Sequence, residues 1–151
     1  MSQKIINLRE NTLYGIPARI REAITNNAED AESRLLDSMV IVKKASDFGT
    51  IDPTKAYFVD GVIDMDGVTV EIPAGGISLL GSTFDISKLV KTEAGTNMFV
   101  SAVGGCGNIL AKDIGFEASG AGSQVWNFTT LTGEEAFEFT RVNYNNCTKI
   151  G

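Results

Sequence analysis

The first clear pattern along the chain is that of an amphipathic helix over residues 17–38. Apolar residues recur there at three- and four-residue steps, and most of the residues between them are charged. Pro17 suits the first helical position, where its missing N–H costs nothing. The helix either packs on its own domain or joins copies of itself around a symmetry axis, because two or three heptads are too few to decide. The residues that would form the association face are Ile20, Ile24, Ala31 and Leu35.

Beyond residue 40 the apolar positions alternate with a period of two, which indicates short β-strands. In the run 68–72, Val, Thr, Val, Glu and Ile alternate between turn sequences at 66–67 and 73–76. Similar short runs, separated by Gly, Asn and Ser, continue along the rest of the chain. We therefore expect a mainly β protein in two parts. An extended arm and helix over 1–39 would serve attachment and oligomerisation, and a β domain would occupy 40–151.

A repeat becomes visible when the β region is shifted along itself. At an offset of 28 residues Ile109 falls on Phe137, and at an offset of 32 Ile77 falls on Ile109, so that both offsets keep the two-residue alternation. Units of this length can coil into a parallel β-helix, in which each coil hydrogen-bonds to the next and like side chains stack inside. An antiparallel sandwich whose hairpins share a spacing is the alternative.

The repeat also specifies which side chains should stack. The further pairs at an offset of 28 are Met98 with Trp126, Val100 with Phe128, Ala111 with Phe139 and Phe116 with Tyr144. The further pairs at an offset of 32 are Leu79 with Ala111 and Phe84 with Phe116. The residues expected to form the stacked core are Phe99, Ile109, Phe116, Trp126, Phe137 and Phe139.

The segment 68–81, which reads VTVEIPAGGISLLG, resembles the entry into a right-handed β-helix of the pectate-lyase-like superfamily. Residues 107–116 and 136–147 are similar to later coils of such a helix, and the resemblance covers about two-thirds of the chain. The charged helical segment in front is similar to the virion-proximal part of bacteriophage tail spikes and fibres. The resemblance implies a homotrimer that attaches to other virion proteins through residues 1–39.

The chain stops directly after a strand and a turn, without a polar capping element at 148–151. A bare terminal coil exposes apolar side chains and unpaired backbone groups. We therefore expect that the β domain is truncated at its C-terminus, or that a partner or a symmetry mate covers the last coil. Either case favours an assembly component over a free-standing enzyme.

The composition of the chain excludes several kinds of catalytic site and partner. The chain has no histidine, which removes Ser-His-Asp and Cys-His arrangements, and its formal net charge of −6 makes nucleic acid a poor partner. The N-terminus lacks the apolar stretch of a signal peptide, and no run approaches the roughly 20 apolar residues of a membrane span. Cys106 and Cys147 lie 41 residues apart without a CxxC motif and are expected to be reduced thiols.

Candidate site residues are few. The acidic residues Asp60, Asp64, Asp66 and Glu71 include the start of a calcium-type loop, but its closing position is Gly75, so a solvated turn is expected. The 32-residue offset would place Asp85 and Glu117 on adjacent coils, as the candidate carboxylates for glycan cleavage, with Asp113 as a further acid. The glycine-rich segments 73–76 and 104–107 lack the Lys-Ser/Thr of a phosphate loop and are expected to be turns. No catalytic, cofactor-binding or metal-binding residue is assigned.

These features favour a structural component of a phage virion appendage: a fibre, a spike or a fibre anchor. It would be synthesised in the host cytoplasm, reside in the virion, and act in particle attachment and host recognition. We expect no enzymatic activity, cofactor or membrane insertion, and a host surface glycan or receptor as a further partner. Two alternatives stay open. One is a polysaccharide-degrading β-helix enzyme or its N-terminal fragment, and the other is a monomeric carbohydrate-binding β-sandwich.

Overall fold

The computed structural model describes residues 38–151, so the predicted arm and the helix with Ile20, Ile24, Ala31 and Leu35 lie outside the described residues. The described part is mainly β, with one short 3-10 helix, and none of its helices is long and apolar enough to cross a bilayer. The elements are β1 (Met39–Val42), η1 (Ala45–Phe48), β2 (Ala56–Val59), β3 (Val62–Asp64), β4 (Val70–Ile72), β5 (Ile77–Leu80), β6 (Lys88–Lys91), β7 (Asn97–Ser101), β8 (Ile109–Lys112), β9 (Gly115–Ala118), β10 (Gln124–Asn127), β11 (Phe137–Thr140) and β12 (Asn143–Tyr144).

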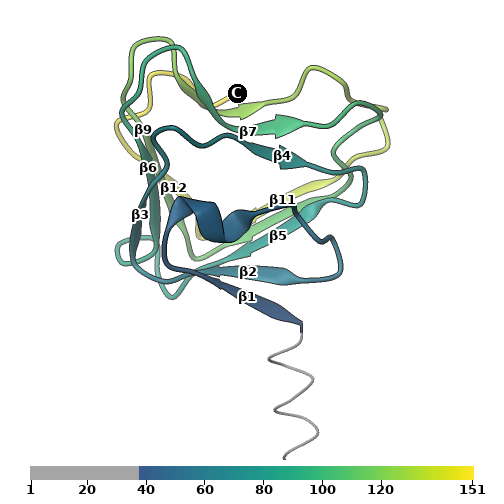
Figure 1. Cartoon of the computed structure of the whole chain (residues 1–151), viewed down its shortest axis with the longest axis horizontal. Helices are drawn as coiled ribbons and strands as arrows, with labels where there is room; N and C mark the ends of the chain where they lie inside the picture. Colours follow the sequence, from purple (N-terminus) through teal and green to yellow (C-terminus); the bar gives the residue numbers. More distant parts are fainter. Residues whose placement is uncertain (1–37) are drawn as a thin grey trace, which may run out of the picture. The chain divides into compact units, whose positions relative to one another are not determined.

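The strands form three parallel sheets that the chain visits in turn (Figure 1). The five-stranded sheet has the order β1-β2-β5-β8-β11, the four-stranded sheet β12-β9-β6-β3, and the three-stranded sheet β10-β7-β4. One passage through the sheets is called a coil here: coil 1 is β2 to β4, coil 2 is β5 to β7, coil 3 is β8 to β10, and coil 4 begins with β11 and β12. All pairs between these strands are parallel, so the antiparallel alternative does not describe this domain, whose stacked sheets are compatible with a β-helix.

Each sheet contributes a column of inward side chains to one shared core. In the four-stranded sheet, Ile63 pairs with Leu89 and Leu89 with Phe116, and all three side chains are buried. In the three-stranded sheet, Phe99 pairs with Trp126, and their rings stack with centroids 4.8 Å apart. Burial of each large apolar side chain contributes roughly 1.5–3 kcal/mol before entropy is counted. The period of two therefore produces the fold directly, because it places every second residue of each short strand in this core.

The predicted register is right in the five-stranded sheet. Ile109 lies opposite Phe137 and Ile77 opposite Ile109, as the two offsets require. The other confirmed pairs of this sheet are Ala111 with Phe139 and Leu79 with Ala111. In the four-stranded sheet the predicted pair of Phe116 with Tyr144 is also confirmed.

Three predicted pairs in the other two sheets are wrong. Phe116 pairs with Leu89 rather than Phe84, because residues 82–87 form an insertion between β5 and β6. Trp126 pairs with Phe99 rather than Met98, and Asn127 rather than Phe128 lies opposite Val100, at an offset of 27 residues instead of 28.

The insertion at 82–87 is held against the neighbouring coils by Ser87. The hydroxyl of Ser87 donates to the carbonyl of Val59 at 2.7 Å and accepts from the N–H of Ser82 at 2.9 Å. Turns at the same corner in coils 1 and 3 have no such insertion: β2 ends at residue 59 with β3 starting at 62, and β8 ends at 112 with β9 starting at 115. The extra residues of coil 2 are therefore absorbed in one pinned loop without disturbing the sheets.

The two ends of the described stack differ. At the first coil, η1 places Phe48 over the core, with its ring centroid 5.9 Å from Tyr57 and 6.0 Å from Phe99. At the last coil, Phe137 and Phe139 are 43% and 42% exposed. The expectation that these two rings are interior is therefore wrong, although their register is right, because within residues 38–151 no further coil stacks on them.

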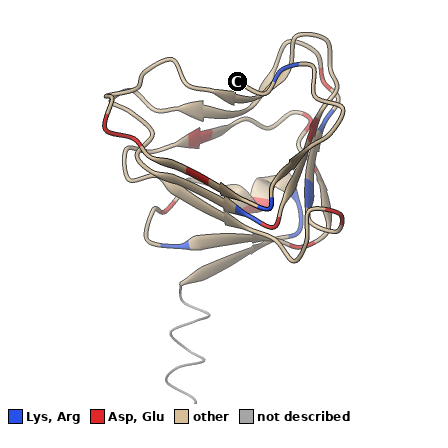
Figure 2. Ribbon diagram, turned by 180° about the vertical axis from the view of Figure 1, so that it is seen from behind, with Lys and Arg blue, Asp and Glu red and all other residues tan. Residues whose placement is uncertain are grey.

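Charged residues are unevenly distributed over the sheets (Figure 2). β1, β2 and β5 of the five-stranded sheet contain no charged residue. The four-stranded sheet carries Asp64, Lys88, Lys91 and Glu117 in its strands.

Replacing Phe116 by Ala is expected to lower the free energy of unfolding by about 3–5 kcal/mol, because its fully buried ring would leave a cavity inside the stack. Phe137→Ala should cost less, about 1–2 kcal/mol, since water already reaches that ring. Urea denaturation followed by the fluorescence of Trp126 measures both losses. Val103→Ala, at a side chain that is 96% exposed, is the control and should change stability by less than about 0.5 kcal/mol. Equal losses at positions 116 and 137 would contradict the exposed last coil.

Candidate functional site

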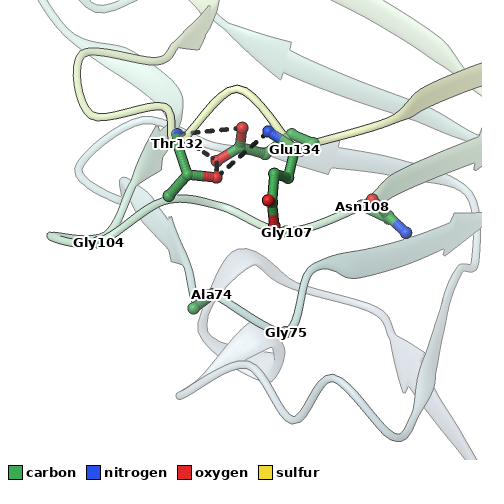
Figure 3. A pocket seen from close by; sticks show the side chains of 8 residues that line it. Ala74, Gly75, Gly104, Gly107, Asn108, Thr132 and Glu134 are labelled. Carbon is green, nitrogen blue, oxygen red and sulfur yellow. Dashed lines mark hydrogen bonds between the residues drawn. The ribbon is translucent and has the colours of Figure 1, made fainter.

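A pocket of about 260 Å³ lies where the chain passes from the three-stranded sheet back to the five-stranded sheet (Figure 3). Three successive coils contribute to it, through residues 74–75, 104–108 and 132–135. The pocket therefore combines turns that are far apart in the sequence but stacked in space, as candidate binding sites commonly do.

Glycines allow the coils to approach closely at this corner. A Cβ added to Gly76, whose φ is +90°, would lie 2.0 Å from the carbonyl oxygen of Asn108. A Cβ added to Gly107, whose φ is +57°, would lie 2.3 Å from the carbonyl oxygen of Ala74. Both positions need the positive φ and the missing side chain that only glycine offers cheaply. The prediction that the glycine-rich segments are turns is confirmed.

The two carboxylates of the pocket have different surroundings. Glu135 accepts hydrogen bonds from the N–H groups of Thr132 and Gly133, both at 2.8 Å, and from the Thr132 hydroxyl at 3.0 Å. These donors, with the Thr132 N–H as the main cause, lower the pKa of Glu135 from 4.5 to about 2. The Glu134 side chain is directed toward the segment at Gly107 (Figure 3).

This arrangement does not form an acid/base pair for glycoside cleavage. Such chemistry requires one carboxyl with a raised pKa, which keeps the proton that it delivers to the leaving group. The hydrogen bonds to Glu135 act in the opposite direction and fix it as an anion. Within residues 38–151, no group of three or more His, Cys, Asp or Glu side chains is placed to hold a metal ion.

The candidate pair Asp85 and Glu117 is not formed. Glu117 lies opposite Val90, and its carboxylate forms an ion pair with Lys88 at 3.3 Å. Asp85 lies in the insertion at 82–87, which is the reason that the 32-residue offset fails at this sheet.

Asp113 forms an ion pair with Arg141 on the next coil instead of taking part in an acidic cluster. The second guanidinium nitrogen of Arg141 donates to Asp113 Oδ2 at 2.9 Å, and this hydrogen-bonded partner lowers the pKa of Asp113. Both residues occupy the left-handed region, with φ of 57° and 50°. The two tight corners of coils 3 and 4 are therefore stacked and tied by opposite charges.

Of the acidic segment 60–71, only the part around Asp66 forms the expected turn, because Asp64 ends β3 and Glu71 lies within β4. Asp66 accepts hydrogen bonds from the backbone N–H groups of Thr92 and Glu93, at 2.7 and 2.9 Å, and from the Thr92 hydroxyl. These bonds, led by the one from the hydroxyl, lower the pKa of Asp66. Asp64 accepts from the N–H of Asp66 at 2.9 Å. The carboxylates bind the protein's own backbone across two coils.

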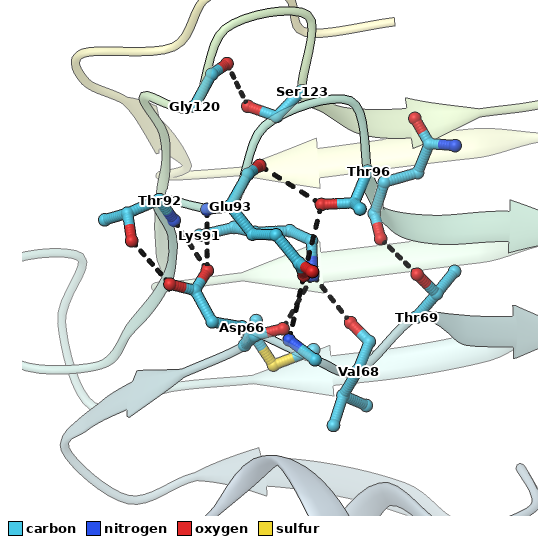
Figure 4. A network of polar contacts seen from close by, with 12 residues as sticks. Asp66, Val68, Thr69, Lys91, Thr92, Glu93, Thr96, Gly120 and Ser123 are labelled. Carbon is cyan, nitrogen blue, oxygen red and sulfur yellow. Dashed lines mark hydrogen bonds and ion pairs between the residues drawn. The ribbon is translucent and has the colours of Figure 1, made fainter.

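Lys91 is a charged residue whose burial the sequence patterns did not predict (Figure 4). Its side chain is fully buried, and its ammonium group donates to the carbonyl oxygens of Met65 at 2.7 Å and Val68 at 2.9 Å. Glu93 Oε2 lies 3.5 Å from the same ammonium and accepts from the N–H of Gly67 at 2.9 Å. Alternation within the strand was the available signal, because Lys91 shares a face with the buried Leu89.

The four core residues of the inner coils are placed together. Phe99, Ile109, Phe116 and Trp126 are all buried in the shared core. Cys106 is buried and Cys147 half-buried, both are free thiols, and burial raises the pKa of each.

Comparison of the chain with protein-family models, curated proteins and solved structures finds no match.

The Lys91→Met variant should lose about 2–4 kcal/mol of unfolding free energy. Methionine fills a similar volume but leaves the carbonyls of Met65 and Val68 without their donor. Lys88→Met is the matched control, because Lys88 forms only a partly exposed ion pair with Glu117, and it should cost at most about 1 kcal/mol. Urea denaturation measures both. Equal losses would show that the buried ammonium group contributes no special stability.

Lowering the pH should lower the stability of the fold, because it protonates Glu135. Because the pKa is lower in the folded chain, the ionised carboxylate stabilises the fold fully above about pH 4.5, and this stabilisation is lost as the pH falls through about 2. Glu135→Gln should therefore be less stable than the parent chain at neutral pH and should lose less stability between about pH 5 and about pH 2.5. Denaturation curves at several pH values measure the slope. Glu134→Gln is the neighbouring control and should retain the slope of the parent chain.

Proposed function

We propose that residues 38–151 are coils of a right-handed parallel β-helix, and that the chain is a structural component of a bacteriophage virion appendage. The appendage would be a fibre, a spike or a fibre anchor. The hand follows from the general rule that crossovers between parallel strands of one sheet are right-handed. The virion setting is supported by the resemblance of segments 68–81, 107–116 and 136–147 to β-helical coils behind a charged helical segment.

The observation that carries the proposal is the stacking of the three sheets over successive coils, around a single core. Each coil adds about 4.8 Å to such a stack, and every interior side chain is held by the coils on either side. A stack of this kind is a stiff rod, which suits a shaft or a receptor-binding appendage. Its surface consists of exposed strand faces and turns, on which contacts to other molecules can vary without changing the core.

In this proposal residues 1–39 attach the chain to other virion proteins. Three copies associate through the helix face of Ile20, Ile24, Ala31 and Leu35. The β-helical body then projects from the particle and meets a host surface glycan or receptor. The alternative of a polysaccharide-degrading enzyme has less support, since Glu135, one of the two carboxylates that line the pocket, is held as an anion by its hydrogen bonds.

Purified full-length chain is expected to form a homotrimer, with a mass by light scattering three times the 16.1 kDa of one chain. Gold-labelled antibodies raised against residues 38–151 should then decorate an appendage on purified particles of the phage that encodes the chain. Particles that lack the chain by mass spectrometry, and bind no antibody, would overturn the virion assignment. Release of new reducing ends or unsaturated sugars from host surface glycans would instead favour the enzyme.

A further inference from the structure

Two columns of outward-facing residues run along the five-stranded sheet. Because the strands are parallel and in register, Phe58 lies between Ile41 and Leu80 in one column, and Ala56 lies beside Met39 in the other. The outward residues of β1, β2, β5 and β8 are apolar except Ser78, which lies between Ala56 and Leu110, and Lys112. The outer apolar face is defined by the six apolar ones: Met39, Ile41, Ala56, Phe58, Leu80 and Leu110. Ile41 is 44% exposed and the other five are half-buried. It is a flat apolar surface on the outside of the stack.

The other two sheets do not have such a face. On the outside of the four-stranded sheet, coils 1 to 3 carry Asp64, Lys88 and Glu117, and the last two form an ion pair. On the outside of the three-stranded sheet, Glu71 and Asn127 flank Val100. An outer face that is mainly apolar, beside two faces on which apolar residues are mixed with charges or amides, is typical of an interaction surface rather than of an ordinary solvated sheet.

The charges at the border of the outer apolar face indicate what covers it. The column of Phe58 and Leu80 continues to Lys112 in coil 3, and the column of Leu110 continues to Glu138 in coil 4. The two charges are opposite in sign, lie one coil apart, and form no ion pair with each other. An acidic or a basic partner would meet one charge of its own sign here. A second copy of the same face brings one of each and can match both.

We propose that the outer apolar face associates with the same face of another copy of this chain, with Lys112 of one copy meeting Glu138 of the next. This inference rests on the homotrimer of the proposed function and specifies which surface of the β domain joins the copies. Copies related by an axis parallel to the stack keep equal coils at nearly equal height. A lysine and a glutamate one coil apart are then separated by only about 4.8 Å along that axis, which their side chains can span.

The size of the face explains why the full chain is needed. Four strands about 4.8 Å apart, each contributing two outward residues, cover on the order of 200 Å² in plan, whereas a stable interface buries roughly 800 Å² per partner. The outer apolar face alone is therefore smaller than a stable interface, and it is tested in the whole chain, in which the proposed function assigns association to residues 1–39 as well.

Photo-crosslinking locates the contact. The photoreactive residue p-benzoylphenylalanine is placed at position 58, on the outer apolar face, or at position 62, where Val62 is 64% exposed on the outside of the four-stranded sheet. Irradiation of full-length chain at low micromolar concentration should give copy-to-copy adducts from position 58 and several-fold fewer from position 62. Equal yields, or adducts from position 62 alone, would overturn the proposal.

Charge-reversal variants test whether Lys112 of one copy pairs with Glu138 of another. Lys112→Glu and Glu138→Lys should each raise the dissociation constant of the oligomer at least tenfold, because each places like charges on facing copies. A mixture of the two variants should regain association, which contacts within one chain cannot explain. Unfolding free energies of both variants, measured by urea denaturation at a concentration where all three chains are monomeric, should match that of the parent chain and so exclude misfolding. A mixture that associates no better than either variant alone would overturn the charge pairing.

The outcomes separate this inference from the proposed function. An oligomer that forms without adducts at position 58 and ignores both charge reversals would refute the outer apolar face as an interface, while the trimer of the proposed function stands. A monomeric chain would refute both the trimer and the self-association of this face. Adducts at position 58 in a chain that is absent from phage particles would refute the virion assignment alone.

Discussion

The burial of each coil by its neighbours is the constraint on which the rest of this structure depends. A strand of three or four residues places only two side chains inward, and a single coil of such strands cannot exclude water from them. Coils in register solve this problem, because Leu89 is covered by Ile63 on one side and Phe116 on the other, while backbone hydrogen bonds run from coil to coil. The same constraint explains the two ends. Phe48 supplies the missing layer at one end, whereas Phe137 and Phe139 are left half-exposed at the other.

Buried polar groups inside the stack also depend on neighbouring coils, which supply their hydrogen-bond partners. Lys91 occupies an inward position, and its ammonium group is satisfied by two backbone carbonyls and a carboxylate of the turn that folds over it. No buried side-chain nitrogen or oxygen among the described residues lacks a hydrogen-bond partner. The acidic residues that could suggest catalysis are used in the same way. Asp66 and Glu135 accept hydrogen bonds from backbone N–H groups, and Asp113 forms an ion pair with Arg141 of the next coil.

This division of roles is the basis of the functional proposal. Inward positions are fixed by packing, and turns are tied by hydrogen bonds between coils, so the outer strand faces are where contacts to other molecules can be specified. The three faces differ clearly: one is apolar near the first coils, and two carry charges or amides. In the proposed function, one mainly apolar outer face suits association with parallel copies of the same chain.

The sequence by itself determined the mainly β class, the period of two beyond residue 40, and the register of Ile77, Ile109 and Phe137. These depend on the spacing of apolar residues within and between strands, which is written in the chain. Tertiary structure alone decided that Leu89, not Phe84, meets Phe116, since a loop of six residues leaves the sheet without changing the local pattern. Tertiary structure also decided which residues Asp85, Glu117 and Lys91 contact, because the partners of a charged side chain lie on the coil stacked beside it. That neighbour lies more than twenty residues away in the sequence, and no local period identifies it.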